Sequence, residues 1–345
     1  MTDNIRINTR VLSGALTGVQ RYVYELSSRI GNELEPVSPN NGLNGLLGHA
    51  WEQLVLPMHL RGKLLWSPSN TGPVLVEKQV LTLHDVNPLD NPQWVSKNFA
   101  RLYRLLLPVL LGRVRKIITV SEFTKSRILY HFPNLETRID VTPLAADQRF
   151  IAVNPSLVSA VKSKLNLPSG RYFLALGSLE PRKNLHRLLL AWERLLPHLP
   201  DDIWLVCVGG KGSERVFGDF VLQNIPRKVF FAGHVDDVYL PSIYSGAIAS
   251  IYLSLYEGFG LPPLEAMSCG SPVIASNLAS IPEVVGGAGL LVDPYNIDEI
   301  IEAILKISRD ESLRSNLRQN GLERSQHFSW DKTALQTINI LNSCI

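Results

Sequence analysis

Short apolar runs alternate with longer amphipathic segments along the whole chain. In the first half, the apolar runs predict β-strands at residues 5–9, 64–66, 79–83, 116–120 and 138–141. Helical spacing of apolar positions predicts helices at residues 19–30, 51–60, 95–111 and 122–130. In the second half, strands are predicted at residues 172–176, 203–208, 229–231, 249–253, 272–275 and 289–292. Strands that alternate with helices predict an α/β protein with parallel sheets covered by helices on both faces.

The alternation weakens between Asp147 and Gly170, where Pro155 and Pro168 interrupt it. A second series of strands starts at Tyr172. We therefore expect a first domain over residues 1–155, a second over 156–328, and a C-terminal helical segment over 329–345.

Length and composition narrow the class of protein. The chain has 345 residues, 45% of them hydrophobic, which suffices for two domains with separate cores. A net charge of +3 is too small to indicate nucleic-acid binding. The most apolar run, residues 105–111, contains Pro108 and is far shorter than the ~20 residues of a membrane-spanning helix. The first residues lack the apolar core of a secretory signal, and the three cysteines have no C-x-x-C spacing, so we expect a reducing, cytoplasmic location.

Positive charge is concentrated in the first half of the chain. Residues 1–150 carry 17 Lys and Arg against 12 Asp and Glu, whereas residues 151–345 carry 17 against 19. Many of these cations lie in the segment 97–116, interleaved with leucines. Such a segment can lie against an anionic membrane surface, and it can also be a core helix with a solvated basic face. Composition does not distinguish the two.

The run from residue 255 to 267, LYEGFGLPPLEAM, follows a predicted strand. Gly258 and Gly260 allow a ligand to approach the backbone N–H groups, because no Cβ stands in the way. The two prolines suit a helix start, whose partial positive charge favours an anion such as a diphosphate. We expect Glu265 near the first turn of that helix. Ionised Glu257 and Glu265 are strong acceptors for hydroxyl groups, although two Glu eight residues apart also occur by chance.

A second run, LGSLEPRKN at residues 176–184, also follows a predicted strand. Asn184 is a plausible helix cap. Arg182 and Lys183 lie at the strand-to-helix turn, where phosphates bind. Two solvated surface charges are the alternative interpretation.

These two runs closely resemble the donor-binding motifs of family 4 of the retaining glycosyltransferases. The resemblance implies the GT-B fold, in which two Rossmann-like, doubly wound domains face each other and a C-terminal helix returns to the first. It implies that the first domain binds the acceptor and the second binds a nucleotide sugar. Family members often carry Arg after Gly177. Ser178 stands there in this chain and leaves Lys183, with Arg182, as the main phosphate contact.

Shorter segments extend the resemblance. Thr17-Gly18-Val19 resembles the family's glycine loop, although Gly18 also suits an ordinary turn. His84 matches a histidine that lies over the donor sugar in the family, although a lone histidine after a strand is more often structural. The run at 233–235 resembles the loop that reads the base, the run at 119–124 resembles the acceptor boundary, and the run at 328–330 resembles the segment before the closing helix. The resemblance implies catalytic roles for Glu257, His84 and Lys183. It implies donor contacts from Gly18, Ser178, Arg182, Lys183, His234, Val235, Glu257, Gly258, Phe259, Gly260, Leu261 and Glu265. It places Arg21, Tyr22, Asp85 and Ser121 on the acceptor side.

Several motifs of other enzyme classes are missing. The chain has no G-x-G-x-x-G, no G-x-x-x-x-G-K-[ST], no H-E-x-x-H and no D-x-D. We therefore expect neither a dinucleotide cofactor nor a metal ion.

The resemblance, including the runs at 208–212 and 280–284, is to bacterial mannosyl- and rhamnosyltransferases of surface polysaccharide assembly, including lipopolysaccharide. It implies transfer of a hexose, with GDP-mannose as first choice of donor, to a saccharide or lipid-linked saccharide acceptor. A UDP-sugar donor, a small soluble acceptor and a non-catalytic nucleotide-sugar sensor are the alternatives. Peripheral association with the cytoplasmic membrane face would follow if the basic segment binds lipid.

Overall fold

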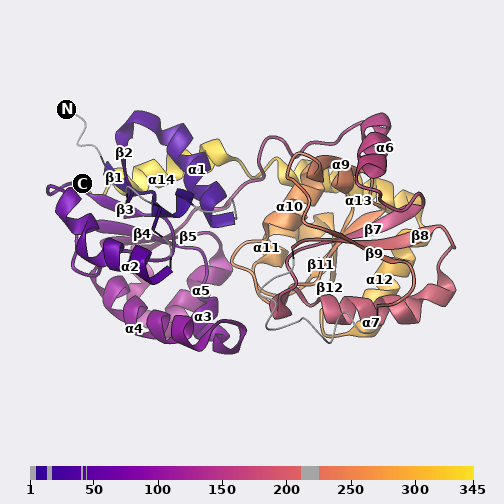
Figure 1. Ribbon diagram of the computed structural model, residues 1–345, viewed down its shortest axis with the longest axis horizontal. Coiled ribbons are helices and arrows are strands. Elements are labelled where there is room, and N and C mark those ends of the chain that lie inside the picture. Colours follow the sequence, from indigo (N-terminus) through magenta and orange to yellow (C-terminus); the bar gives the residue numbers. More distant parts are fainter. Residues whose placement is uncertain (1–4, 14–17, 40–41, 44, 211–224) are drawn as a thin grey trace. The chain divides into compact units, whose positions relative to one another are not determined.

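The computed structural model describes residues 5–13, 18–39, 42–43, 45–210 and 225–345. The chain divides into two compact units (Figure 1). Unit 1 comprises Met1–Leu144 and Ser329–Ile345, and unit 2 comprises Ala145–Phe328. We had expected the boundary at 155/156. It falls earlier because Phe150 packs edge to face on Tyr244 of unit 2, with ring centroids 6.0 Å apart.

Unit 1 is built on a six-stranded sheet of order β2-β1-β3-β4-β5-β6, and every pairing described in it is parallel. Its strands are β1 (Ile5–Asn8), β2 (Leu34–Val37), β3 (Leu65–Ser67), β4 (Gln79–Leu83), β5 (Lys116–Thr119) and β6 (Ile139–Val141). Its α-helices are α1 (Gly18–Ile30), α2 (Gly45–Leu54), α3 (Asn87–Asp90), α4 (Lys97–Arg113), α5 (Glu122–His131) and α14 (Trp330–Asn342).

Strand β4 shows how alternation places the two faces of this sheet. Leu81 and Leu83 join a buried core with Leu107 of α4. Thr82 points to the opposite face, where its hydroxyl lies 3.3 Å from that of Tyr22 on α1. Helices α1 and α14 cover that face, and α4 covers the other (Figure 1).

Unit 2 repeats this architecture with a parallel sheet of order β12-β11-β10-β7-β8-β9. Its strands are β7 (Arg171–Leu176), β8 (Ile203–Val208), β9 (Val229–Gly233), β10 (Ala249–Tyr252), β11 (Val273–Ser276) and β12 (Leu290–Val292). Its described α-helices are α6 (Pro155–Lys164), α7 (Leu185–Leu195), α9 (Leu240–Ser245), α10 (Leu261–Ser268), α11 (Ile281–Val285), α12 (Ile297–Arg309) and α13 (Glu311–Ser325). On β7, Phe173 packs against Trp192 of α7, while the Tyr172 hydroxyl donates to the Ile243 carbonyl of α9 on the opposite face.

The predicted α/β fold with parallel sheets is confirmed in both units. The sequence analysis missed β2, a four-residue strand at the sheet edge that contains Pro36. Proline weakens a strand pattern and is tolerated at sheet edges, which accounts for the omission. Helix α2 also starts earlier than predicted, at Gly45, and a 3₁₀ turn, Leu56–His59, follows it.

Each sheet reverses its strand order at one place. In unit 1 the chain goes from β1 outward to β2 and returns to β3 on the other side of β1. In unit 2 it goes from β7 outward through β8 and β9 and returns to β10 on the other side of β7. Ligands of doubly wound sheets bind beyond the carboxyl ends of the strands at such switch points. We therefore expect a site beyond the carboxyl ends of β1 and β3, or of β7 and β10, and call these places the β1/β3 and β7/β10 edges.

Candidate active site

The β7/β10 edge of unit 2 is shaped by a close approach of two loops. Gly177 follows β7 and Gly209 follows β8. A Cβ on Gly209 would lie 2.0 Å from the Gly177 carbonyl oxygen, so no larger residue fits there. The backbone that leads from β7 to Ser178 therefore stays close to the end of β8.

Two cations at this edge share one carboxylate oxygen. The Nζ of Lys183 lies 2.7 Å from Oε1 of Glu257, and Nη1 of Arg182 lies 2.8 Å from the same oxygen. Arg182 also donates from Nε to Glu180 at 2.7 Å, and Lys183 donates to the Tyr252 hydroxyl at 2.6 Å. Lys183 and Glu257 side chains are each 13% exposed, so this is a largely buried cluster of fixed charges.

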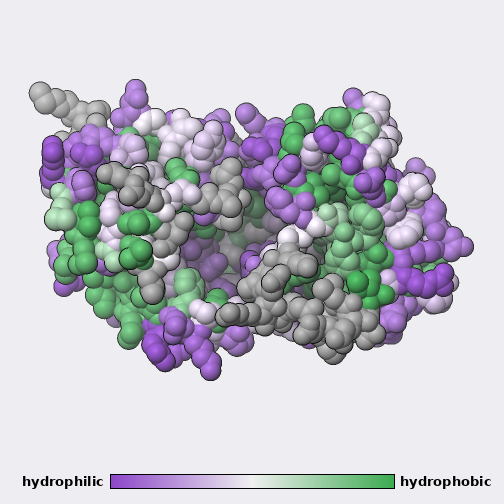
Figure 2. Space-filling model, in the orientation of Figure 1, coloured by the Kyte–Doolittle hydropathy of each residue, from purple (hydrophilic) through white to green (hydrophobic). Residues whose placement is uncertain are grey.

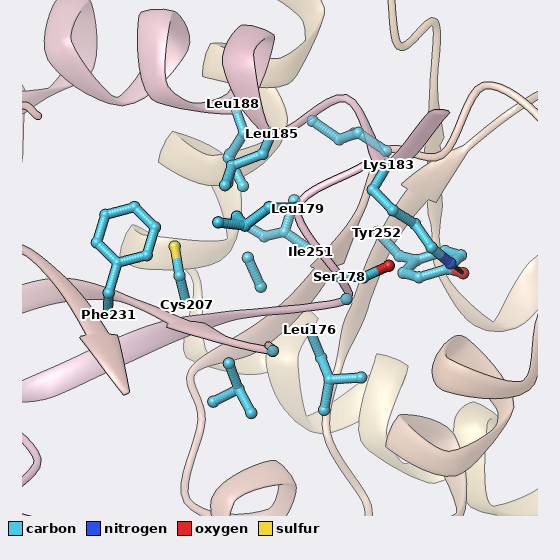
Figure 3. Close-up of a pocket in the computed structure, with 15 residues that line it drawn as sticks. Leu176, Ser178, Leu179, Lys183, Leu185, Leu188, Cys207, Phe231, Ile251 and Tyr252 are labelled. Atoms are coloured by element: carbon cyan, nitrogen blue, oxygen red, sulfur yellow. Dashed lines mark hydrogen bonds between the residues drawn. The ribbon is translucent and has the colours of Figure 1, made fainter. Parts of the chain in front are cut away.

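The same lysine closes the polar end of a pocket (Figure 3). Its ammonium group points to the Tyr252 hydroxyl there, with Ser178 close by. Leu188 of α7, Cys207 of β8 and Phe231 of β9 form the apolar end. An anionic group is favoured only at the end that carries Lys183.

Burial and the neighbouring cations act in opposite directions on Glu257. Burial alone would raise the pKa of its carboxyl group, but the charges of Lys183 and Arg182 outweigh that effect and lower the pKa to about 2. Burial lowers the pKa of Lys183, and the Glu257 carboxylate only partly opposes this shift. Glu257 is therefore ionised at neutral pH.

The loop between β10 and α10 holds Glu257 in place. The Ser280 hydroxyl lies 2.9 Å from the Glu257 carbonyl oxygen and 2.6 Å from that of Phe259. Gly260 has a φ of +114°, and a Cβ there would lie 2.7 Å from Cδ1 of Ile281. Glycine is therefore required at the position that turns the loop into the helix.

Helix α10 offers fewer backbone donors than we expected. It begins at Leu261, but Pro262 and Pro263 have no N–H group. Of the first three residues of this helix, only Leu261 therefore has a backbone N–H group. The positive charge for a bound anion therefore depends on the side chains of the neighbouring cations.

Glu265 is the fifth residue of α10 and therefore lies directly after the first turn, close to its expected position. It is buried, and the Tyr244 hydroxyl donates to its Oε2 at 3.3 Å. Glu257 and Glu265 thus have different partners: the first contacts cations, and the second contacts a buried phenol.

The remaining donor-side predictions fall on two loops of unit 2. Ser178 donates from Oγ to Glu180 at 2.7 Å. After β9, the His234 side chain is exposed, with Nε2 3.9 Å from Asp236, and Val235 is buried. Lys211 and Gly212, part of the run at 208–212, lie outside the described residues, as does Thr17 of the glycine loop.

In unit 1, His84 follows β4, the strand next to β3, and lies inside the unit. Its Nε2 lies 2.9 Å from the Pro68 carbonyl oxygen, and its ring packs edge to face on Tyr22 at 4.7 Å. Burial lowers the pKa of His84 to about 4, so the imidazole is neutral at pH 7. Asp85, next in the chain, accepts a hydrogen bond from the Asn87 amide at 3.0 Å.

The other first-half predictions divide into internal and more accessible side chains. Tyr22 is fully buried, and Ser121 caps α5 by accepting from the Thr124 amide at 3.0 Å. Arg21 is half-buried on α1, and Gly18 is the first residue of that helix. Tyr22 and Ser121 therefore hold elements of unit 1 together.

Residues 160–324 match the model of the family described as glycosyl transferases group 1. The chain is 38% identical over 272 residues to the O-antigen chain mannosyltransferase B of Escherichia coli, an alignment that covers 77% of this chain and 71% of that protein. The chain belongs to the glycosyl transferase group 1 family.

Solved structures of low sequence identity share the complete fold of this glycosyltransferase. The Anabaena protein HepE, solved with UDP and glucose, has a TM-score of 0.78 at 19% identity, with 99% of both chains covered. WaaG, a glycosyltransferase involved in lipopolysaccharide biosynthesis, has a TM-score of 0.75 at 16% identity, with 98% of this chain and 99% of that chain covered. The expected GT-B fold is confirmed, as is the expected likeness to transferases of bacterial surface polysaccharide.

The sequence analysis of this glycosyltransferase missed three side chains of the cluster: Glu180, Tyr252 and Ser280. Glu180 stands inside the recognised run at 176–184, so its position next to Arg182 was available as a signal. Ser280 likewise opens the recognised run at 280–284, whereas Tyr252 contacts the site through tertiary structure alone.

Two features are absent from the described residues. No group of three or more His, Cys, Asp or Glu side chains placed to hold a metal ion occurs in them. None of their helices is both long and apolar enough to span a bilayer.

Proposed function

We propose that this glycosyltransferase transfers mannose from GDP-mannose, with retention of anomeric configuration, to a hydroxyl of a saccharide or lipid-linked saccharide in surface polysaccharide synthesis. The observation that carries the proposal is the half-buried cluster of Lys183, Arg182 and Glu257 at the switch point of unit 2. The mannosyltransferase relative from Escherichia coli supports the choice of sugar.

In the proposed step, the bond between the anomeric carbon and the diphosphate oxygen breaks, and its electron pair stays on the diphosphate. Lys183 and Arg182 stabilise the charge that develops there. The acceptor hydroxyl oxygen forms the new bond from the same face of the sugar, and its proton passes to the leaving phosphate oxygen.

The other donor contacts follow from where the side chains lie. Glu257 binds sugar hydroxyls, and Glu265 binds the ribose. Ser178, Gly258, Phe259, Gly260 and Leu261 line the diphosphate and sugar, and the loop of His234 and Val235 binds the base. The donor displaces part of the internal pairing between Glu257 and the cations, because the diphosphate competes for the same groups.

Unit 1 supplies the acceptor side in this proposal. Arg21 and Asp85 contact the acceptor, and Tyr22 and Ser121 position the elements that carry them. Gly18 approaches the donor phosphates, and the neutral His84 imidazole contacts the donor sugar.

The test is release of nucleoside diphosphate from a panel of GDP- and UDP-sugars, followed by NMR of the transferred sugar. We expect slow GDP release from GDP-mannose without acceptor and an α-linked product with acceptor. If a UDP-sugar is turned over faster than GDP-mannose, GDP-mannose is not the donor. A product with the opposite anomeric configuration to the donor would overturn retention. Tight binding without any turnover would indicate a nucleotide-sugar sensor instead.

We further propose that unit 1 docks on an anionic membrane surface that carries the acceptor. Apolar side chains from α2, the following 3₁₀ turn, the 72–76 loop and α4 are 49–73% exposed: Leu47, Leu54, Met58, Leu75, Leu105 and Val109. Green surface gathers over these elements in Figure 2. The loop contacts both helices. Gln53 of α2 donates to the Gly72 carbonyl and accepts from the Val74 amide. Arg113 of α4 donates to the Val74 carbonyl.

Charge on this face matches an anionic lipid. Helix α4 contains no Asp or Glu, and its Arg101, Arg104 and Arg113 are exposed. Each Lys or Arg near an anionic surface contributes about 1 kcal/mol, an effect that salt weakens.

Sedimentation with vesicles of 70% phosphatidylcholine and 30% phosphatidylglycerol tests the docking. We expect binding at low salt that falls when Arg101, Arg104 and Arg113 are changed to Gln. The matched control changes three exposed arginines of unit 2, Arg194, Arg309 and Arg318, and should bind as the unchanged protein does. Equal binding of both triple variants, or none by the unchanged protein, rejects the docking.

A further inference from the structure

Two aromatic side chains flank the place where the chain passes from unit 2 back to unit 1. Phe328 is the last residue of unit 2, and Ser329 is the first residue of the C-terminal part of unit 1. Trp330 begins α14, and its side chain is only 4% exposed. Its ring packs against that of Tyr22 on α1, with centroids 6.2 Å apart. The chain is therefore anchored in unit 1 two residues after Phe328.

Arg324 of α13 holds the Phe328 ring from within unit 2. Its guanidinium carbon lies 5.1 Å from the ring centroid, within the range of a cation–π interaction. The same guanidinium donates from Nε to the Val284 carbonyl at 3.0 Å and from Nη2 to the Glu283 carbonyl at 2.5 Å. Both carbonyls belong to α11, the helix that follows Ser280. The Phe328 ring is therefore tied to the elements that surround the loop of Glu257.

The loop between β10 and α10 contacts Phe328 directly, through one ring. Phe259 packs edge to face on Phe328, with centroids 5.7 Å apart and an interplanar angle of 81°. Phe259 stands between Gly258 and Gly260 and is 6% exposed. Because glycine has no side chain, Phe259 is the only one of these three residues that can anchor the loop by packing. Glu257 directly precedes this segment, so its position depends on that anchor.

Hydrogen bonding of the loop backbone leaves room for a second restraint. The Ser280 hydroxyl lies 2.9 Å from the Glu257 carbonyl oxygen and 2.6 Å from that of Phe259. A hydroxyl has one proton to donate, so the two carbonyls share it. Packing of Phe259 on Phe328 resists a pivot of the loop about this shared bond. We propose that Phe328 is a positioning residue that acts through Phe259 to hold Glu257 against the reacting sugar, an inference that rests on the proposed function.

A displaced Glu257 should affect transfer more than nucleotide binding. The cations proposed for the diphosphate come from the turn after β7 and have contacts of their own. Lys183 donates to the Tyr252 hydroxyl, and Arg182 donates to Glu180. These contacts do not involve the loop of Glu257, so GDP should still bind when the loop shifts. A residue that only stabilises the fold would lower the thermal midpoint and leave kcat of the folded protein unchanged.

The test compares Phe328→Ala with the unchanged protein in GDP release from GDP-mannose and in calorimetric titration with GDP. We expect kcat to fall about ten-fold, because small displacements of a reacting group slow a reaction, and the Kd of GDP to change less than about two-fold. Phe328→Tyr keeps the ring and should retain kcat. The matched control is Leu313→Ala, which shortens a half-buried side chain of α13 packed on the core of unit 2. It should lower the thermal midpoint without lowering kcat.

A double-mutant cycle tests whether Phe328 acts through Phe259. Phe259→Ala should also lower kcat, and adding Phe328→Ala to it should lower kcat further by less than about two-fold, because the partner ring is already absent. If the two separate defects multiply, Phe328 acts by another route and the inference is wrong. Should Phe328→Ala fail to fold, Phe328→Leu takes its place in every comparison.

The outcomes separate this inference from the proposed function. Normal GDP release by the unchanged protein together with an unchanged kcat for Phe328→Ala rejects the positioning role alone. An equal fall in kcat for Leu313→Ala would show a general effect of destabilisation and would also reject it. No GDP release from GDP-mannose by the unchanged protein rejects the proposed function, and this inference with it.

Discussion

The two switch points of this glycosyltransferase use polar groups in opposite ways. In unit 2, the two cations Lys183 and Arg182 pair with the single carboxylate of Glu257 at 2.7 and 2.8 Å. In unit 1, one arginine, Arg10, pairs with one carboxylate, Glu52, so the two charges of this buried pair balance. The comparison shows that the two switch points differ in net charge: two cations share one anion in unit 2, whereas one cation pairs with one anion in unit 1. The cations of unit 2 suit a diphosphate.

The largest effect is expected from a change in the ion cluster of unit 2. Lys183→Met removes a cation from the leaving diphosphate and leaves Glu257 with Arg182 alone. We expect kcat to fall about 10³-fold, equivalent to about 4 kcal/mol. Steady-state kinetics with the donor identified above measures it. Lys306→Met, at an exposed position of α12, is the control, and a fall of less than ten-fold for Lys183→Met would contradict the role of this lysine.

Glu257→Gln tests the anion of the same cluster. The reacting sugar gains positive charge as its bond breaks, so the carboxylate acts mainly in the transition state. We expect kcat to fall about 10²-fold, equivalent to roughly 2.7 kcal/mol, with a smaller change in KM. Exposed Glu302→Gln on α12 should leave both constants unchanged. A near-normal kcat for Glu257→Gln would remove this residue from the sugar site.

His84 tests how the stability of unit 1 depends on pH. Its pKa is about 4 in the folded state against 6.5 for the free group. Both states are neutral above pH 6.5, but below it the unfolded state takes up the proton first, so folding loses stability as the pH falls. We expect a loss of about 2 kcal/mol between pH 7 and pH 5 from this group.

Urea unfolding at both pH values measures this difference. The loss should shrink in His84→Gln and persist in His59→Gln, which changes an exposed histidine of the same unit. An equal loss in all three proteins would show that His84 titrates normally. The window lies above the range in which the low pKa of Glu257 affects stability, because that contribution is lost only below pH 4.5.

Glu265→Gln should have a smaller effect than Glu257→Gln. The ribose does not change in the reaction, so its contacts are equal in the ground and transition states. We expect the donor KM to rise about ten-fold while kcat stays constant. Glutamine is preferred to alanine because it keeps a partner for the buried Tyr244 hydroxyl. A fall in kcat like that of Glu257→Gln would show that the two carboxylates act together.

The smallest expected effect is that of a chelator. Lys183 and Arg182 supply the positive charge at the proposed diphosphate site, and the sequence has no D-x-D. We expect the rate in 10 mM EDTA to stay within about two-fold of the untreated rate, because side-chain cations can replace a metal ion at a phosphate. Loss of turnover that magnesium or manganese restores would contradict this prediction.

The sequence alone determined the class of fold and the location of the charged site. Strands such as β4 are mainly apolar and buried on both faces, and this pattern is typical of parallel sheets. The run that contains Arg182 and Lys183 and the run that contains Glu257 are local: each follows one strand and depends on glycine or proline at fixed positions. Local patterns of this kind can be read from neighbouring residues.

Only the tertiary structure decided which side chains pair. Glu52 lies 42 residues from Arg10 and 19 from Thr71, so their bonding leaves no local signal. Lys183 and Glu257 were both expected at the site, but their shared oxygen required β7 and β10 to lie side by side. The physical reason is that periodicity and turn chemistry act between near neighbours in sequence, whereas burial and hydrogen-bond satisfaction are properties of the folded chain as a whole.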